Sequence, residues 1–198
     1  MILNYCYFHS FHLKFCRSPN HNILLVLVFG EDKQKALNLL FKDVKEDILI
    51  LTDGDTIVGD EAIAEIIKKF RAPAVGVVTG RVVSANSKST MLGYCSHLLA
   101  DAGAHRIRKE KDMKDAFIEA TGYLFAFRNN IVNRIPLDVA EDTIIPYLFY
   151  EKGYKIRYAE RALVYVKNPT TLKDWFEQRK RTAKAHETLS KYVNVKLT

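Results

Sequence analysis

The stretch Ile48-Leu49-Ile50-Leu51-Thr52-Asp53-Gly54-Asp55 joins a short apolar run to two carboxylates that lie two positions apart. A continuous apolar run of this length is typical of a strand that is buried on both faces. Side chains at i and i+2 of an extended segment point the same way, so Asp53 and Asp55 could face one ligand. Gly54 would leave room for that ligand beside the backbone. The alternative is an Asp-Gly-Asp turn without a ligand.

Strand and helix patterns alternate around this stretch. The apolar run Ile23–Phe29 predicts a buried strand, with a short core helix as the alternative. Helical spacing follows over 37–44, and Asp60 is positioned to cap a second helix over 63–70. Residues 74–83 are rich in strand-forming side chains. Alternation of this kind is typical of βαβ units, and it predicts an α/β fold with a mostly parallel sheet flanked by helices.

The second half of the chain continues the alternation less regularly. Pro146 interrupts a predicted helix over 142–152 and is an alternative start for it, because proline lacks an amide hydrogen. Gly153 is the expected helix stop. Thr171 and Asp174 have capping-box spacing at the start of a last helix. The other predicted elements are a helix over 87–112 and strands over 123–127, 155–158 and 162–166.

The composition is that of a globular chain. Of 198 residues, 48% are hydrophobic and 27% are charged, which excludes a disordered protein. The longest apolar run, Ile23–Phe29, is far shorter than the roughly 20 residues that cross a bilayer. The first residues lack the basic start of a secretion signal. Three cysteines cannot all pair internally, so a cytoplasmic location is expected, either free or at the cytoplasmic face of a membrane.

Residues 1–22 show no clear period and are left without an assigned element. One alternative is a zinc site, because the side-chain types are suitable and lie within eleven positions of one another. Its spacing differs from that of common zinc fingers, and the competing interpretation is apolar cysteines and surface histidines. The four residues concerned are Cys6, His9, His12 and Cys16.

Positive charge is concentrated at the C-terminal end. Residues 152–198 hold 12 basic and 4 acidic side chains, whereas residues 1–151 hold 18 and 19. A basic region attracts polyanions such as nucleic acid, acidic lipid or a diphosphate group. A solvated helix face is the alternative.

Two further motifs could carry chemistry. Glu141-Asp142 stands before an apolar helix, where the helix dipole would favour acids even without a function. Gln178-Arg179-Lys180-Arg181 offers guanidinium groups, which bind phosphate through two hydrogen bonds. The alternative for this second motif is an ordinary basic helix face.

The order of these motifs is informative. In sequence they are Lys35-Ala36-Leu37-Asn38, Asp53-Gly54-Asp55, Thr121-Gly122-Tyr123, Glu141-Asp142, Gly153-Tyr154-Lys155-Ile156 and Gln178-Arg179-Lys180-Arg181. In that order and spacing, about residues 23 to 185 resemble the family 2 glycosyltransferases, which include cellulose, chitin and hyaluronan synthases. The resemblance implies a GT-A fold and transfer of a sugar from a nucleotide-diphosphate sugar to a hydroxyl acceptor, with inversion.

The resemblance also implies roles for individual residues. Asp53 and Asp55 would hold Mg²⁺ or Mn²⁺ on the diphosphate, and Asp142 would be the general base. Substrate-binding roles fall on Lys35, Asn38, Gly122, Tyr123, Glu141, Gln178, Arg179 and Arg181. The expected partners are a nucleotide-sugar donor and a carbohydrate or lipid-linked acceptor, and no nucleic acid. Peripheral membrane contact through the basic helix at 173–184 is a further expectation.

The chain departs from the family pattern in two places. The family begins with a βαβ segment whose Asp binds the nucleoside, and residues 1–22 do not show that pattern. We therefore expect a partial catalytic domain over 23–190, incomplete at its N-terminal nucleotide-binding part, a tail over 191–198, and a partner chain as one way to complete the site. Thr182 stands where the family motif has Trp, although Trp175 lies nearby. The alternatives are a non-catalytic remnant and a basic nucleic-acid-binding module.

Overall fold

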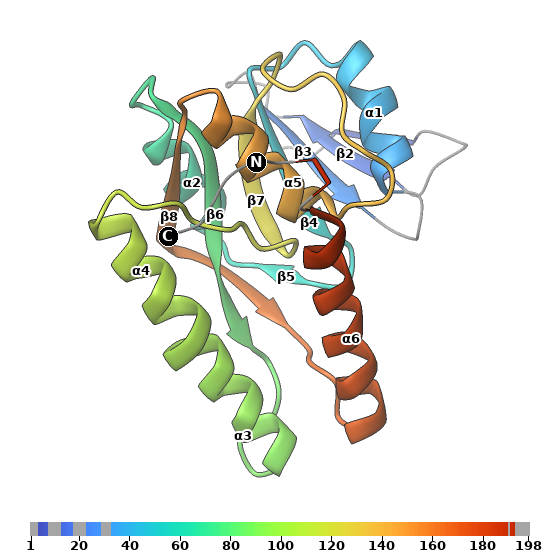
Figure 1. Cartoon of the computed structure of the whole chain (residues 1–198), viewed down its shortest axis with the longest axis vertical. Coiled ribbons are helices and arrows are strands. Elements are labelled where there is room, and N and C mark those ends of the chain that lie inside the picture. Colours follow the sequence, from blue (N-terminus) through green and yellow to red (C-terminus); the bar gives the residue numbers. More distant parts are fainter. Residues whose placement is uncertain (1–3, 8–12, 18–22, 29–32, 190, 193–198) are drawn as a thin grey trace.

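A computed structural model describes residues 4–7, 13–17, 23–28, 33–189 and 191–192. The described strands form one sheet in the order β1-β2-β3-β4-β7-β6-β8-β5, with helices packed around it (Figure 1). The strands are β1 Asn4–Tyr7, β2 Leu13–Arg17, β3 Ile23–Val28, β4 Ile48–Asp53, β5 Ile57–Val58, β6 Val75–Ser84, β7 Leu124–Arg128 and β8 Lys155–Val166. The helices are α1 Lys33–Asp43, α2 Ala62–Lys69, α3 Met91–Leu98, the π-helix η1 Leu99–His105, α4 Arg106–Met113, α5 Glu141–Glu151 and α6 Leu172–Leu189.

The sheet is mixed. Strands β3 and β4 are parallel, and so are β6 and β8, whereas the other described pairs are antiparallel. The main cause lies at the centre, where β7 inserts between β4 and β6 and runs against both. The predicted α/β class with flanking helices is confirmed, but the sheet is not mostly parallel.

Two apolar clusters lie on opposite faces of the sheet. Along β4, Leu49 and Leu51 join the cluster that contains α1 and α5, whereas Ile50 joins the cluster that contains α2. Strand β7 divides in the same way, with Phe125 and Phe127 on one side and Leu124 and Ala126 on the other. Successive strand residues point to opposite faces, and here both faces are covered. This double burial explains why the central strands are continuous apolar runs.

Several local predictions are confirmed. Gly153 has φ +83° just after α5, a conformation that favours glycine at a helix end. The Thr171 hydroxyl accepts from the Asp174 amide at 3.2 Å and donates to its carboxylate at 2.7 Å, which completes the expected capping contact at the start of α6. The helical region predicted over 87–112 is an unbroken helical run over 91–113, with η1 at its middle.

Three details differ from the predictions. Glu61, not Asp60, is the residue before α2, and its side chain makes no cap hydrogen bond. Pro146 lies inside α5, which begins at Glu141, because the first helical turns form ahead of the proline. The two predicted strands at 155–158 and 162–166 are one strand, β8, with an irregularity in register where Gly80 is followed by Arg81 on β6. A bulge bends a strand without ending it.

Strands β1 and β2 lie within residues 1–22, for which the sequence predicts no element, and they extend the sheet beyond β3. Cys6 and Cys16 fall in these strands, whereas His9 and His12 of the zinc alternative lie outside the described residues. Among the described helices, none is both long enough and apolar enough to cross a membrane.

Candidate active site

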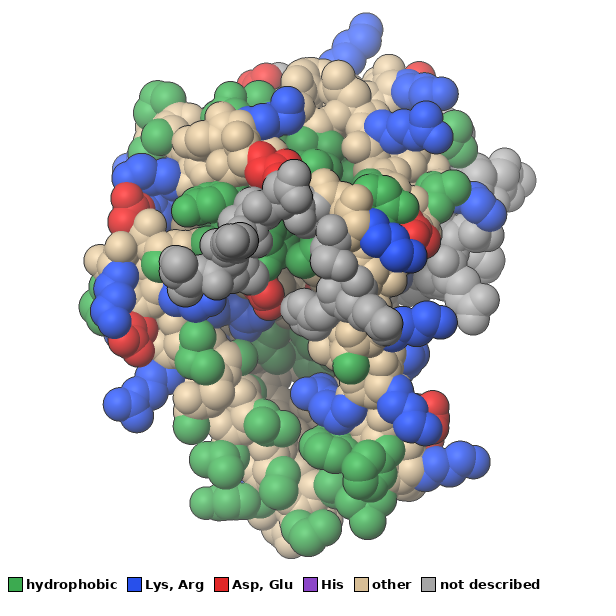
Figure 2. Space-filling model, viewed as in Figure 1, with side chains coloured by type: hydrophobic (Ala, Val, Ile, Leu, Met, Phe, Trp, Pro, Cys, Tyr) green, Lys and Arg blue, Asp and Glu red, His purple; other side chains and the backbone are tan. Residues whose placement is uncertain are grey.

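A cavity of about 530 Å³ opens beyond the carboxyl end of β4. The space-filling view shows the surface hollowed between α3 and α6 (Figure 2). Polar and charged side chains from five separate parts of the chain reach this cavity. They are Asp53, Arg108, Glu119, Tyr123, Asp142, Gln178, Arg179 and Arg181, together with Trp175 and the backbone of Gly122.

Asp53, the last residue of β4, is held by a lysine of the first helix. The Lys33 ammonium contacts Asp53 Oδ1 directly and lies 3.9 Å from Glu141 Oε1. Burial lowers the pKa of Lys33, but the carboxylates of Glu141 and Asp53 outweigh burial and raise it overall. Lys33 is therefore a stable cation that partly neutralises two acids at the cavity edge.

The turn after β4 is fixed by a chain of hydroxyl groups. The buried Thr52 hydroxyl donates to the Tyr123 carbonyl at 2.7 Å and lies 3.1 Å from the Thr56 hydroxyl. Thr56 donates to the Asp53 carbonyl at 2.9 Å. These bonds tie the Asp-Gly-Asp turn to the start of β7. They therefore set the position of Asp53 relative to Gly122 and Tyr123.

Glu141 and Asp142 open α5 at the other side of the cavity. Glu141 is buried and accepts from Gln34 Nε2 at 3.4 Å, whereas half-buried Asp142 lines the cavity. A Cβ atom on Gly122 would lie 2.9 Å from Asp142 Oδ2, closer than a Cβ atom can normally approach. Glycine at position 122 is thus required for the Asp142 carboxylate to occupy its place.

Burial raises the pKa of both acids. It raises the pKa of Glu141 to about 7, with help from the charge of Asp142 and against the charge of Lys33. Burial also raises the pKa of Asp142, against a backbone hydrogen bond from Gly122 and the charge of Lys33. A carboxyl group whose pKa is raised is a stronger base when it is ionised, which suits a group that removes a proton.

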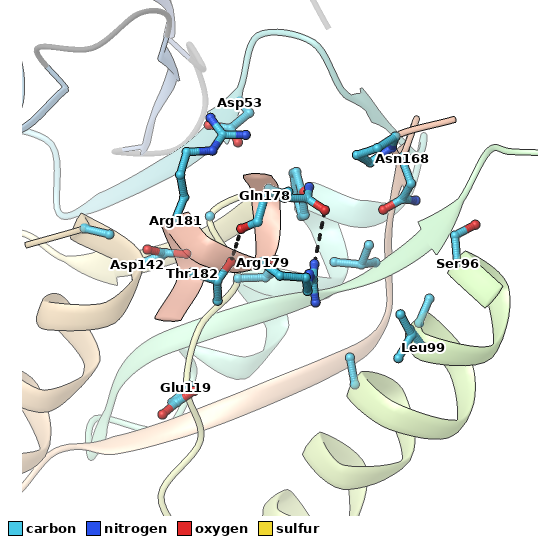
Figure 3. Close-up of a pocket in the computed structure, with 18 of the residues that line it drawn as sticks. Asp53, Ser96, Leu99, Glu119, Asp142, Asn168, Gln178, Arg179, Arg181 and Thr182 are labelled. Carbon is cyan, nitrogen blue, oxygen red and sulfur yellow. Dashed lines mark hydrogen bonds between the residues drawn. The ribbon is translucent and has the colours of Figure 1, made fainter. Parts of the chain in front are cut away.

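Helix α6 supplies the facing wall. Gln178 Nε2 donates to the Tyr123 hydroxyl at 3.4 Å, and Arg179 donates to Gln178 Oε1 at 3.1 Å. The Arg179 guanidinium lies 5.8 Å from the centre of the Trp175 ring. In the close-up, the Arg181 side chain extends toward the part of the cavity where Asp53 lies (Figure 3).

The aromatic surface of α6 comes from Trp175. Position 182, where the family motif has Trp, is a threonine that also lines the cavity. Trp175 lies seven residues, or about two helical turns, before Thr182, so the two share one face of α6. Helix α6 therefore presents an indole ring to the cavity about two turns before the position of the Trp in the family motif.

Four predicted site residues lie away from the cavity wall, and one of them is the buried Glu141 described above. Lys35 is exposed on α1. The Asn38 side chain instead holds the chain before α5, since it donates to the Ile135 carbonyl at 2.9 Å and accepts from the Ile135 amide at 2.8 Å. Asp55 is exposed on the turn, two residues beyond Asp53. Their roles toward a substrate or a metal stay predictions.

The motif analysis missed Lys33 and Arg108. Lys33 lies one turn before Leu37, so the helical period already placed it on the core-facing side of α1. Arg108 lines the cavity from α4 and donates to the Glu119 carbonyl at 3.1 Å. Burial lowers the pKa of Arg108, while the charges of Tyr158, Glu119 and Asp142 oppose that change. No pattern around residue 108 in the sequence pointed to this role.

The acids at the cavity suit a metal ion that is held jointly by the protein and by substrate phosphates better than one held by protein side chains alone. Within the described residues, no three His, Cys, Asp or Glu side chains are close enough to hold an ion by themselves. Mg²⁺ and similar ions are often held by one or two carboxylates together with substrate phosphates. Asp53 and Asp55 could supply this kind of site, in which Lys33 would have to release Asp53.

The sequence profile of the glycosyl transferase family group 2 matches residues 48–185, which include Asp53, Asp142 and the Gln178–Arg181 motif. The chain belongs to this family. It is 28% identical over 179 residues to the poly-beta-1,6-N-acetyl-D-glucosamine synthase of Staphylococcus aureus strain COL, and 27% identical over 177 residues to that of Staphylococcus epidermidis. These alignments cover 87% and 86% of the present chain and 43% of each synthase. The chain therefore spans less than half of the length of these relatives.

A solved structure supports the fold assignment. The mannosyltransferase PcManGT from Pyrobaculum calidifontis, in complex with GDP-Man and Mn²⁺, aligns with a TM-score of 0.50 at 19% identity. The alignment covers 76% of the present chain and 40% of the mannosyltransferase. At this level of identity the likeness concerns the fold alone.

Proposed function

We propose that this chain transfers a sugar from a nucleotide-diphosphate sugar to a hydroxyl group of an acceptor, with inversion at the anomeric carbon. The observation that carries the proposal is that Asp53, Asp142 and the α6 arginines face one cavity. Two acids with different surroundings lie opposite guanidinium groups. This arrangement suits a reaction that removes a proton on one side and develops negative charge on the other.

Each residue would have a distinct task. Asp142 would accept the proton of the acceptor hydroxyl as its oxygen attacks the anomeric carbon, and the bond from that carbon to the diphosphate oxygen would break. Arg179 and Arg181 would bind the negative charge that accumulates on the departing diphosphate. Trp175 would offer a flat apolar surface to a sugar ring. A Mg²⁺ or Mn²⁺ ion held by Asp53 and Asp55 would supply additional charge neutralisation.

The similar proteins suggest which ligands to test first. The staphylococcal relatives are named for a polymer of N-acetylglucosamine, and the archaeal mannosyltransferase was solved with GDP-Man and Mn²⁺. We infer that the donor is a sugar linked to a nucleoside diphosphate and that the acceptor carries a carbohydrate hydroxyl. UDP and GDP are therefore the first nucleotides to compare.

Calorimetric titration of the chain with UDP and with GDP, each with and without Mn²⁺, tests the donor site. We expect binding that requires Mn²⁺ and that Asp53→Asn weakens by roughly 100-fold, because the neutral amide is a much poorer ligand for a hard cation. The matched control is Asp60→Asn, which removes an exposed carboxylate from the loop before α2. Binding that is independent of Mn²⁺, or that both variants weaken equally, would contradict the proposed donor site.

A further inference from the structure

The active-site cavity has one polar wall and one apolar wall. The polar wall is formed by the acids and by α6, as described above. The opposite wall comes from β6, α3 and η1, and most of its side chains are apolar, namely Val82, Leu92, Leu99, Ala100 and Ala104. A sugar that filled the whole cavity would leave hydroxyl groups against this wall with few hydrogen-bond partners. The apolar wall therefore suits a different part of the ligand.

The apolar wall continues onto the outside of the molecule. Leu99 lines the cavity and is also 47% exposed, and the preceding Leu98 and Tyr94 are 54% and 59% exposed. On the other side of the opening, Trp175 lines the cavity and the neighbouring Phe176 and Leu172 are exposed. Figure 2 shows hydrophobic side chains gathered at this end of the molecule, on both sides of the hollow.

So many exposed apolar side chains around one opening are unusual on a surface that is in contact with water. Scattered apolar side chains are common, but exposed apolar side chains that gather around a cavity opening generally mark a binding site. This group, which comprises Met91, Tyr94, Leu98, Leu99, Leu172 and Phe176, will be called the apolar rim. Lys88, Lys173 and Arg179 are exposed within the segments that carry the rim.

We propose that the acceptor is amphipathic, with a sugar head group in the cavity and a hydrocarbon chain that lies along the apolar rim. The head group would present its hydroxyl to Asp142, and the chain would leave between α3 and the first turns of α6. The neighbouring cations would suit a phosphate linker between head group and chain. This inference rests on the proposed transferase function and specifies its acceptor as a lipid-linked sugar.

The emission of Trp175 provides a direct test, because it is the only tryptophan of the chain and lines the cavity. The probes are the methyl and octyl glycosides of N-acetylglucosamine, below the micelle concentration, and 1,2-octanediol. We expect the octyl glycoside to bind at least ten-fold more tightly than the methyl glycoside, since the chain buries apolar surface on the rim. We also expect it to bind at least ten-fold more tightly than the octanediol, which has no sugar.

Matched leucines provide the variants. Leu98→Ser/Leu172→Ser removes two rim side chains that are 54% and 53% exposed, whereas Leu137→Ser removes a side chain that is 52% exposed on the segment before α5. The double variant should lose the advantage of the octyl chain and keep its affinity for the methyl glycoside. Leu137→Ser should bind all three probes as the unmodified chain does, and circular dichroism should show that each variant is folded.

Three outcomes would overturn the proposal. These are equal affinity for the methyl and octyl glycosides, an octyl advantage that survives in the double variant, and octanediol that binds as tightly as the octyl glycoside. Binding to sugar-free phosphatidylcholine vesicles that only the double variant loses would assign the rim to a bilayer surface instead. The titrations contain no nucleotide, so their result is separate from that of the donor-site experiment.

Discussion

Asp142→Asn should lower kcat for sugar transfer by roughly 10² to 10⁴-fold, the range that a positioned general base contributes. The amide has nearly the same shape as the carboxylate but cannot accept the proton of the acceptor hydroxyl. Asp142 lines the cavity beside Gly122, which has no Cβ atom to crowd the carboxylate, so an amide of the same size should fit in the same place. Steady-state measurement of nucleotide release with donor and acceptor present would give kcat.

Affinity for the donor separates this effect from a general loss of structure. Calorimetry should show Mn²⁺-dependent nucleotide binding in Asp142→Asn that is within a few-fold of the unmodified chain. Asp60→Asn is a suitable control, because this carboxylate is exposed before α2 and does not line the cavity. A kcat for Asp142→Asn that matches the control would remove Asp142 from the role of base.

Glu141→Gln should stabilise the fold at neutral and alkaline pH. Burial raises the pKa of Glu141 from 4.5 to about 7, so the folded state binds a proton that the unfolded state has already lost over this interval. Stability from this group is therefore full below pH 4.5 and is lost as the pH rises through 7. At about 1.4 kcal/mol per pH unit, this pKa shift limits the gain in the free energy of unfolding of the variant to about 3 kcal/mol.

Urea unfolding of both chains between pH 4 and pH 9 measures this effect. The free energies of unfolding should coincide near pH 4, and the variant should be more stable above pH 7. The charged groups that face Glu141 are Asp142, Lys33 and Asp53, and they are the same in both chains. Glu151→Gln, at the exposed end of the same helix, should leave the pH dependence unchanged. Parallel curves for Glu141→Gln and the unmodified chain would show that Glu141 is not buried as a neutral acid.

The central parts of the fold could be predicted because a strand that is buried on both faces appears in the sequence as a continuous apolar run. Strand β4 is an unbroken apolar run that ends in Asp53, and α1 and α2 carry their core residues at helical spacing. Those patterns place the Asp-Gly-Asp turn at a strand end, where ligands gather in α/β sheets. The Thr171–Asp174 capping contact likewise fixes the start of the helix that carries Gln178 and Arg181.

Other features depend on contacts between distant segments. Strand direction is not encoded in apolar alternation, so the insertion of β7 between β4 and β6 could not be foreseen. The motif drew attention to Lys35, whereas the helical phase points to Lys33, which contacts Asp53. Arg108 reaches the cavity because η1 packs on β6 and α4 packs on β8. The mixed polar sequence of this helical region does not predict that packing.

The most direct test of the proposed transfer is to follow the anomeric proton by NMR while the chain acts on an α-linked nucleotide sugar and the octyl glycoside. UDP-N-acetylglucosamine and GDP-mannose are the donors to compare. A single displacement with Asp142 as base predicts that the first product is the β-linked glycoside and that Asp142→Asn forms it far more slowly. An α-linked first product, or equal rates in the two chains, would contradict the account.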